Sequence, residues 1–378
     1  LDHSGNSFNP PLLDSTFVIA ALLAVFTILF GTRHLDATER HEGMVAAIAF
    51  ESVVKLLAFL AVGLFVTYGM FGGFSELFER AAAAPELARL LQPDSSRAGT
   101  WTALILLSGL AIVFLPRQFQ IIVVENVDES HLRRAVWLFP LYLLLINIFV
   151  LPLALGGLLH FQGQSFNPDT FVLTLPLSRG AEALALLVFI GGLSAATGMV
   201  IVETIALSTM VCNDLVMPWL LRAQWFGISE RRDLSGILLG IRRAAIVVIL
   251  LLGYIYFRAA GEAYALVGIG LISFAAVAQF APAMFGGMYW KQGTHAGAVA
   301  GLLGGFAVWL YTLLLPSFAK SGWIDRGFVE QGLWGIGAFK AQALFGLGGL
   351  DEISHSLWWS LLINIGLYVA VSLNTRPD

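Results

Sequence analysis

The chain has 378 residues, of which 58% are hydrophobic and only 12% charged, and its mean hydropathy is +0.81. Soluble domains carry roughly 25% charged residues, so the composition excludes an ordinary soluble domain and predicts an integral membrane protein. The net charge of −4 indicates no nucleic-acid partner, and the single cysteine, Cys212, excludes an intrachain disulfide.

Apolar runs long enough to cross a bilayer follow one another along the chain. A helix needs about 20 residues to span the hydrocarbon core. The runs predict an all-α polytopic membrane protein with about nine transmembrane helices. The predicted spans are Ser15–Gly31, Met44–Phe71, Trp101–Val124, Val136–Leu159, Ala183–Val211, Ile237–Phe257, Ala263–Phe285, Ala296–Pro316 and Leu357–Leu373.

Two longer connections are expected on the outer side of the membrane. Residues 72–100 contain an amphipathic helix that breaks at Pro85, and residues 317–356 are rich in glycine and aromatic residues. We expect both to cover the outer surface, with a lid as the alternative. The whole chain, residues 1–378, is predicted to be a single transmembrane domain. It lacks an initiator Met and a signal peptide, so we expect a fragment of a longer protein.

The distribution of basic residues predicts the orientation. Loops on one side collect twelve Lys and Arg residues, whereas the longer loops on the other side hold eight. Because basic residues favour the cytoplasmic side, the N-terminus of the chain is predicted outside and the C-terminus inside. The expected location is a bacterial inner membrane.

The second span carries two charges, Glu51 and Lys55, which share one helical face because they are four residues apart. Lys55 lies about 18 Å along the helix from Gly43, near the middle of the bilayer. A charge at that depth costs at least about 2.5 kcal/mol on insertion scales, so it faces the bundle interior. Two interpretations stay open: an ion or substrate path, or a neutralised pair that holds two helices together.

The fifth span adds a third intramembrane charge, Glu203, which is either a proton carrier or a partner of Lys55. The same span contains Gly191, Ser194, Ala195 and Thr197, small or hydroxyl-bearing residues that suit close helix packing or a hard cation.

Pro116 ends an apolar run, which predicts a broken helix of the kind found at transporter binding sites. No motif indicates an enzyme, and no histidine pair has metal-ligand spacing.

Three segments resemble the sodium:solute symporter family. They are Gln279 to Gly305 (QFAPAMFGGMYWKQGTHAGAVAGLLGG), Gly31 to Glu39 (GTRHLDATE), and the inner loop from Pro116-Arg117 to Arg133-Arg134-Ala135. The resemblance covers essentially the whole chain, as the last nine of thirteen helices. It implies a LeuT-like fold of two inverted repeats, with substrate and cation bound at unwound helices near the midplane.

The resemblance also assigns site residues. Gly191 and Ser194 match the family's sodium-site pattern, whereas Ala195 stands where a hydroxyl is usual and Thr197 lies two residues off it. The substrate-helix candidates are Ser108, Ile112 and Pro116. Ser108 and Ile112 replace the aromatic residues of proline permeases, which argues against proline as the substrate.

Several segments, such as FLPRQFQIIVVEN, are closer to the symporter-like input domain of large sensor histidine kinases of the CbrA type. The leading hypothesis is therefore a transporter-like domain that binds or carries a small polar metabolite, in particular an amino acid. It would serve as the sensory input of a histidine kinase, with a cytoplasmic kinase domain and a response regulator as partners. The coupling ion would be sodium or a proton. The alternatives are a plain sodium-coupled permease and a transport-dead membrane anchor.

Overall fold

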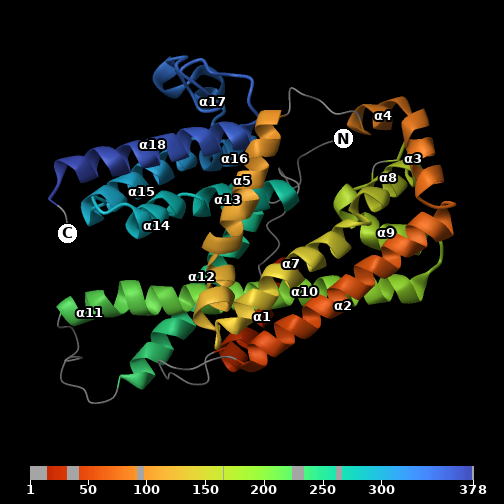
Figure 1. The fold of residues 1–378 in the computed structure, drawn as a ribbon, viewed down its shortest axis with the longest axis horizontal. Helices are drawn as coiled ribbons and strands as arrows, with labels where there is room; N and C mark the ends of the chain where they lie inside the picture. Colours follow the sequence, from red (N-terminus) through yellow and green to blue (C-terminus); the bar gives the residue numbers. More distant parts are fainter. Residues whose placement is uncertain are drawn as a thin grey trace. The chain divides into compact units, whose positions relative to one another are not determined.

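The computed structural model describes residues 15–31, 42–91, 98–164, 166–223, 234–260 and 266–376. Most of these residues are helical (Figure 1). The only sheet in the described ranges is a small antiparallel hairpin of β1 (Phe339–Lys340) and β2 (Ala343–Leu344). The all-α class predicted from the sequence is confirmed.

Among the described residues, seven helices are long and apolar enough to cross a membrane. They are Val45–Met70, Ser130–His160, Glu182–Leu220, Ser235–Arg258, Val267–Tyr289, His295–Lys320 and Glu352–Asn374. Several correspond to predicted spans but extend further at one or both ends. A polytopic membrane protein is therefore confirmed.

Two further predicted spans take other forms. The helix pair Ala98–Phe114 and Pro116–Val124 is bent by 50° at Pro116 and counts as an eighth span if the pair crosses as one. α1 (Ser15–Gly31) is apolar but has only 17 residues. Within the described ranges, seven or eight helices are thus long enough to span a membrane. The predicted number of nine spans is not confirmed.

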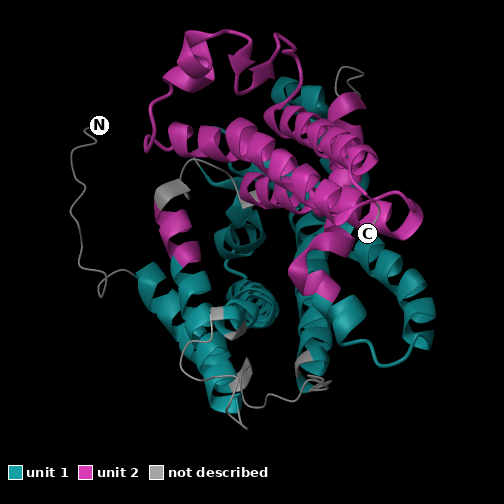
Figure 2. Ribbon diagram, turned by 90° about the vertical axis from the view of Figure 1, so that its left-hand side faces the viewer, with its two compact units in different colours: residues 1–93, 120–251 teal, residues 94–119, 252–378 magenta. Residues whose placement is uncertain are grey.

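The chain groups into two compact units, coloured separately in Figure 2. Unit 1 comprises residues 1–93 and 120–251, and unit 2 comprises residues 94–119 and 252–378. The helix α12 (Ser235–Ala260) contributes to both units.

Unit 1 is built around α2 (Glu42–Leu64) and α10 (Glu182–Met210). Its other elements are η2 (Phe65–Met70), α3 (Phe74–Ala83), α4 (Pro85–Leu91), η4 (Gln120–Val124), α7 (Ser130–Asn147), α8 (Val150–His160), η5 (Pro168–Thr170), α9 (Phe171–Ser178), η6 (Val211–Val216) and α11 (Met217–Ala223). The core gathers where η2, α3, α8 and α9 meet, around Val66, Leu77, Leu153 and Leu175. The break between α3 and α4 falls at Pro85, where the amide that a continuous helix needs is missing.

Unit 2 contains the helices α5 (Ala98–Phe114), α6 (Pro116–Phe119), α13 (Leu266–Val277), α14 (Phe280–Tyr289), α15 (His295–Trp309), η8 (Leu310–Leu314), α16 (Leu315–Lys320), α17 (Gly327–Gln331), η9 (Leu333–Gly335) and α18 (Glu352–Asn374). Its core joins α5, α13 and α18 through Leu107, Ile272, Leu357 and Leu361. The sequence predicts one outer loop over residues 317–356. The structure instead ends α16 at Lys320 and begins α18 at Glu352, so the connection is residues 321–351.

The helices α15 and α18 lie side by side along most of their lengths (Figure 1). Gly297, Gly301 and Gly305 recur every four residues on α15 and so share one face. A methyl group built on Gly297 would lie 2.7 Å from the carbonyl oxygen of Tyr368, and one on Gly301 would lie 2.8 Å from that of Asn364. Glycine therefore permits direct backbone contact between the two helices, as is typical of membrane helix pairs.

Candidate functional site

The two long helices of unit 1, α2 and α10, bring the intramembrane charges of the second span against the small residues of the fifth. α10 makes its most extensive contacts with α2. Gly191 of α10 is buried, and a methyl group there would lie 3.2 Å from Cβ of Ala58 and 3.9 Å from Cα of Lys55. The helices approach closely because α10 presents little side-chain bulk on this face.

Glu51 lies directly against Gly198 on the same face. A methyl group on Gly198 would collide with Oε2 of the Glu51 carboxylate. Gly191 and Gly198 are seven residues apart, which is about two helical turns. Over these two turns α10 packs against the α2 segment that contains Glu51 and Lys55. The absence of a side chain at Gly198 leaves the space that the carboxylate fills.

Tyr142 of α7 is a third contributor at this position. Its hydroxyl donates a hydrogen bond to the carbonyl oxygen of Ser52, with 3.3 Å between the oxygens. It also lies within electrostatic range of the Glu51 carboxylate, as Lys55 does. Three helices therefore meet at Glu51, which we call the α2–α10 site (Glu51, Lys55, Tyr142, Gly191 and Gly198).

The two charged side chains of the α2–α10 site are half-buried. A carboxylate and an ammonium group on adjacent turns offer one acceptor of strong hydrogen bonds and one donor. Because Glu51 and Lys55 lie four residues apart on one helical face, the same two groups can also neutralise each other.

The other predicted residues of α10 have different environments. Ala195 is buried, Ser194 is half-buried, and the hydroxyl of Thr197 donates to the carbonyl oxygen of Leu193 on its own helix at 2.8 Å. Glu203 lies further along α10, is half-buried and already has an interaction partner. Gly191, one of the four predicted cation-binding residues, lies in close contact with α2.

The predicted substrate-helix residues belong to unit 2. α5 buries Ala103, Leu107, Ala111 and Phe114, whereas Ser108 and Ile112 are exposed on the same helix. The helix ends at Phe114 and a new one begins at Pro116, so the break predicted at this proline is present. Proline prevents continuation because it lacks the amide hydrogen and its ring crowds the preceding turn.

Two members of the α2–α10 site, Tyr142 and Gly198, are not predicted from the sequence. Tyr142 lies in the largely apolar part of α7, residues 135–146, and a hydroxyl there is a signal for a polar contact across helices. Gly198 was part of a small-residue run, but only the packing shows that it faces a carboxylate.

A buried polar cluster in unit 2 was also missed. Gln279 interrupts the span between α13 and α14, and its side chain donates to Oγ of Ser360 at 2.8 Å. Asn364 of α18 in turn donates to the carbonyl oxygen and to Oε1 of Gln279, at 2.8 and 3.1 Å. These bonds satisfy a carbonyl group that the helix break would otherwise leave unpaired in an apolar environment.

Within the described ranges, no group of three or more His, Cys, Asp or Glu residues is arranged to hold a metal ion. Comparison with models of known protein families, with curated protein sequences and with solved structures finds no match to this chain.

Proposed function

We propose that the chain is a secondary-transporter-type membrane domain that binds or carries a small polar metabolite, in particular an amino acid. The proposal includes an inverted-repeat architecture and a role as the sensory input of a histidine kinase, both of which rest on the sequence resemblance. The proposal is supported by the polytopic helical membrane architecture and by the charged residues at a helix interface.

The observation that carries the proposal is the position of Glu51 against Gly198, with Lys55 one turn away. The carboxylate therefore faces the neighbouring helix α10, and in the proposal it is the group that binds the polar solute or ion. Intramembrane ionisable groups in bundle interiors commonly mark such sites.

The coupling ion in this proposal is a proton or sodium. Ala195 supplies no hydroxyl, so the family's sodium pattern is incomplete, whereas Glu51 and Glu203 provide carboxylates that bind protons. Uptake into vesicles under a sodium gradient, compared with uptake under a pH gradient, separates the two ions.

A transport-dead anchor is the second candidate, and the alanine at position 195 is the observation that favours it. A plain sodium-coupled permease is the third. In an anchor, removing either charge of α2 changes assembly or nothing, whereas in a transporter or a sensor it changes uptake or signalling in a folded protein.

The test uses Glu51→Gln and Lys55→Met in the full-length protein, with uptake of the common amino acids and ligand-dependent signalling as readouts. Glu79→Gln and Lys291→Met are matched controls, because both side chains are exposed and lie outside the α2–α10 site. We expect normal membrane insertion and at least about a tenfold loss of response in the two site variants, equivalent to about 1.4 kcal/mol. A response equal to that of the controls in both site variants would reject the proposal.

A further inference from the structure

Unit 2 contains a cavity of about 360 Å³ between the helices α15 and α18 and the connection formed by residues 321–351. Its lining comprises Ala307, Val308, Tyr311, Leu333, Trp334, Phe339, Leu344, Phe345, Trp359 and Ile363. None of these residues is charged. The hydroxyl of Tyr311 is already used, since it donates to the carbonyl oxygen of Phe339.

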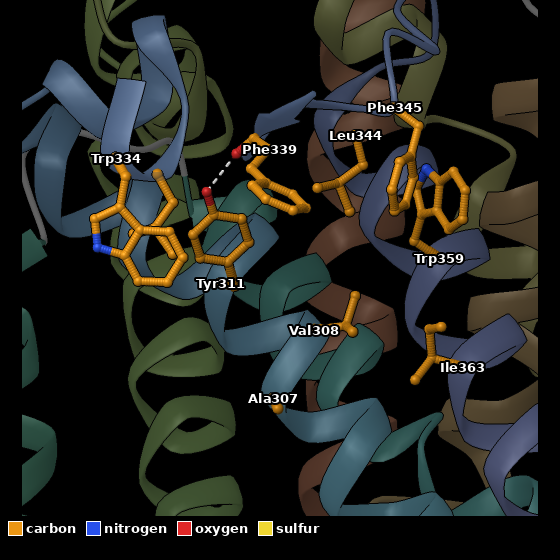
Figure 3. Close-up of a pocket in the computed structure, with 10 residues that line it drawn as sticks. Ala307, Val308, Tyr311, Trp334, Phe339, Leu344, Phe345, Trp359 and Ile363 are labelled. Carbon is orange, nitrogen blue, oxygen red and sulfur yellow. Dashed lines mark hydrogen bonds between the residues drawn. The ribbon is translucent and has the colours of Figure 1, made fainter. Parts of the chain in front are cut away.

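Aromatic rings line the cavity from end to end. Figure 3 shows Trp334 and Tyr311 on one side and Phe345 and Trp359 on the other, with Phe339, Leu344 and Val308 between them. The ring centroids of Phe345 and Trp359 are 5.3 Å apart. The lining is therefore an elongated apolar surface that offers a polar solute little hydrogen bonding.

The backbone is unusual at two points of this lining. Trp334 and Phe345 have φ angles of 56° and 54°, and they are the only non-glycine residues with positive φ among those described. A bulky L-residue seldom adopts this left-handed conformation. Such residues concentrate at ligand clamps and switch regions, where the surrounding structure holds them in place.

The connection is apolar on its outer surface as well. Trp323, Trp334, Phe345 and Leu347 are each more than 60% exposed. Exposed tryptophan next to the end of a membrane helix is typical of the interface between headgroups and acyl chains. The exposed aromatic surface around the cavity is therefore of the kind that suits this interface.

We propose that this cavity binds one acyl chain of a membrane phospholipid. A cavity of about 150 Å³ with a similar apolar lining holds a benzene molecule, so the larger and elongated space here accommodates several methylene groups. Ala307 and Ile363, which line the cavity, are also exposed on the spanning helices α15 and α18. The lipid would hold the 321–351 connection against α15 and α18. This inference is independent of the proposed function.

The test is quenching of Trp359 fluorescence in phosphatidylcholine vesicles whose acyl chains carry bromine. The chain has ten tryptophans, so the signal of Trp359 is the difference between the wild-type chain and Trp359→Phe. Ala307→Phe fills the cavity, and Ala296→Phe is the matched control, because it places the same ring at an exposed position of α15 outside the cavity.

We expect brominated chains to quench Trp359 in the wild-type chain and in Ala296→Phe, and at least twofold less in Ala307→Phe. The absence of quenching in the wild-type chain overturns the proposal. Equal quenching in both phenylalanine variants also overturns it, because Trp359 would then contact bulk lipid without a cavity site. As a second measurement, native mass spectrometry is expected to show one retained phospholipid fewer for Ala307→Phe than for Ala296→Phe.

Discussion

In the α2–α10 site, the lack of a side chain at Gly198 allows the Glu51 carboxylate to lie against α10. The missing side chain leaves the space that the Glu51 carboxylate fills. Alanine is the better helix former by about 1 kcal/mol, so glycine at a mid-helix position has a cost that close packing offsets here.

We expect Gly198→Ala to fold and to lose at least about tenfold in solute response, because the new methyl group displaces the carboxylate of Glu51. Gly192→Ala is the matched control on the same helix, since a methyl group there has no neighbour within 4 Å. Solute-dependent uptake or signalling measures the effect. A Gly198→Ala protein that responds like Gly192→Ala would show that the position of the carboxylate is irrelevant.

Asp351 connects the N-terminal ends of two helices in unit 2. Its carboxylate accepts hydrogen bonds from the amide of Ser354 at 3.1 Å and from the hydroxyl of Thr100 at 2.6 Å. Burial raises the pKa of the Asp351 carboxyl, but the bonds from Ser354 and Thr100 lower it by more, so this pKa lies below its ordinary value.

The pH dependence follows from that direction. Because the folded-state pKa is the lower one, the stabilisation is complete above the unfolded-state pKa of about 3.9 and disappears as pH falls through the folded value. We expect Asp351→Ala to lower the free energy of unfolding by about 1 kcal/mol at pH 7 and to abolish this part of the acid dependence. Thermal unfolding of both proteins from pH 7 to pH 3 measures it. A constant difference across that range contradicts the account.

At the scale of elements, the contact between α15 and α18 depends on three glycines. Methyl groups on Gly297 and Gly301 meet backbone carbonyl groups of α18, which move only if the helix moves. Overpacking of this kind typically costs about 1–3 kcal/mol.

We therefore expect Gly301→Ala to lower the free energy of unfolding by about 1–3 kcal/mol, as measured in detergent by thermal or denaturant unfolding. Gly366→Ala on α18 is the control, since a methyl group there meets nothing within 4 Å and alanine favours the helix. Equal stability of the two variants would mean that the helices separate without cost.

The sequence predicted the elements better than their contacts. Hydropathy located the apolar helices because length and composition alone determine whether a helix can span a bilayer. The sequence also predicted the helix breaks at Pro116 and Pro85, because proline interrupts a helix through its own missing amide hydrogen and its ring. The interruption at Gln279 was not predicted, because it depends on Asn364, 85 residues further along the chain, to satisfy the freed carbonyl group.

At the candidate site, too, the sequence predicts residues but not the contacts between them. Glu51 and Lys55 stood out in the sequence, since charges are rare in apolar spans. The contact of Glu51 with Gly198 depends on the rotation of α10 about its axis. Apolar residues are spread around α10 without a distinct polar face, so periodicity could not reveal this rotation.

For the whole molecule, the distribution of basic residues predicts which connections lie inside. Single cysteines at Asp128 and Gln292 are expected to react with an impermeant maleimide from the cytoplasmic side only, and those at Gln164 and Glu330 from the outer side only. All four side chains are exposed, and the background is Cys212→Ser, since Cys212 is the only native cysteine. Labelling of all four from one side would refute the predicted orientation.

The proposed solute site beside Glu51 can be tested by solute protection of a cysteine at Ser194. Ser194 is half-buried on α10, between Gly191 and Gly198. In the Cys212→Ser background, we expect Ser194→Cys to react with a small hydrophilic maleimide and at least one common amino acid to slow the reaction severalfold. Adding Glu51→Gln is expected to remove that protection. A cysteine that does not react, or that no amino acid protects, would contradict the proposed site.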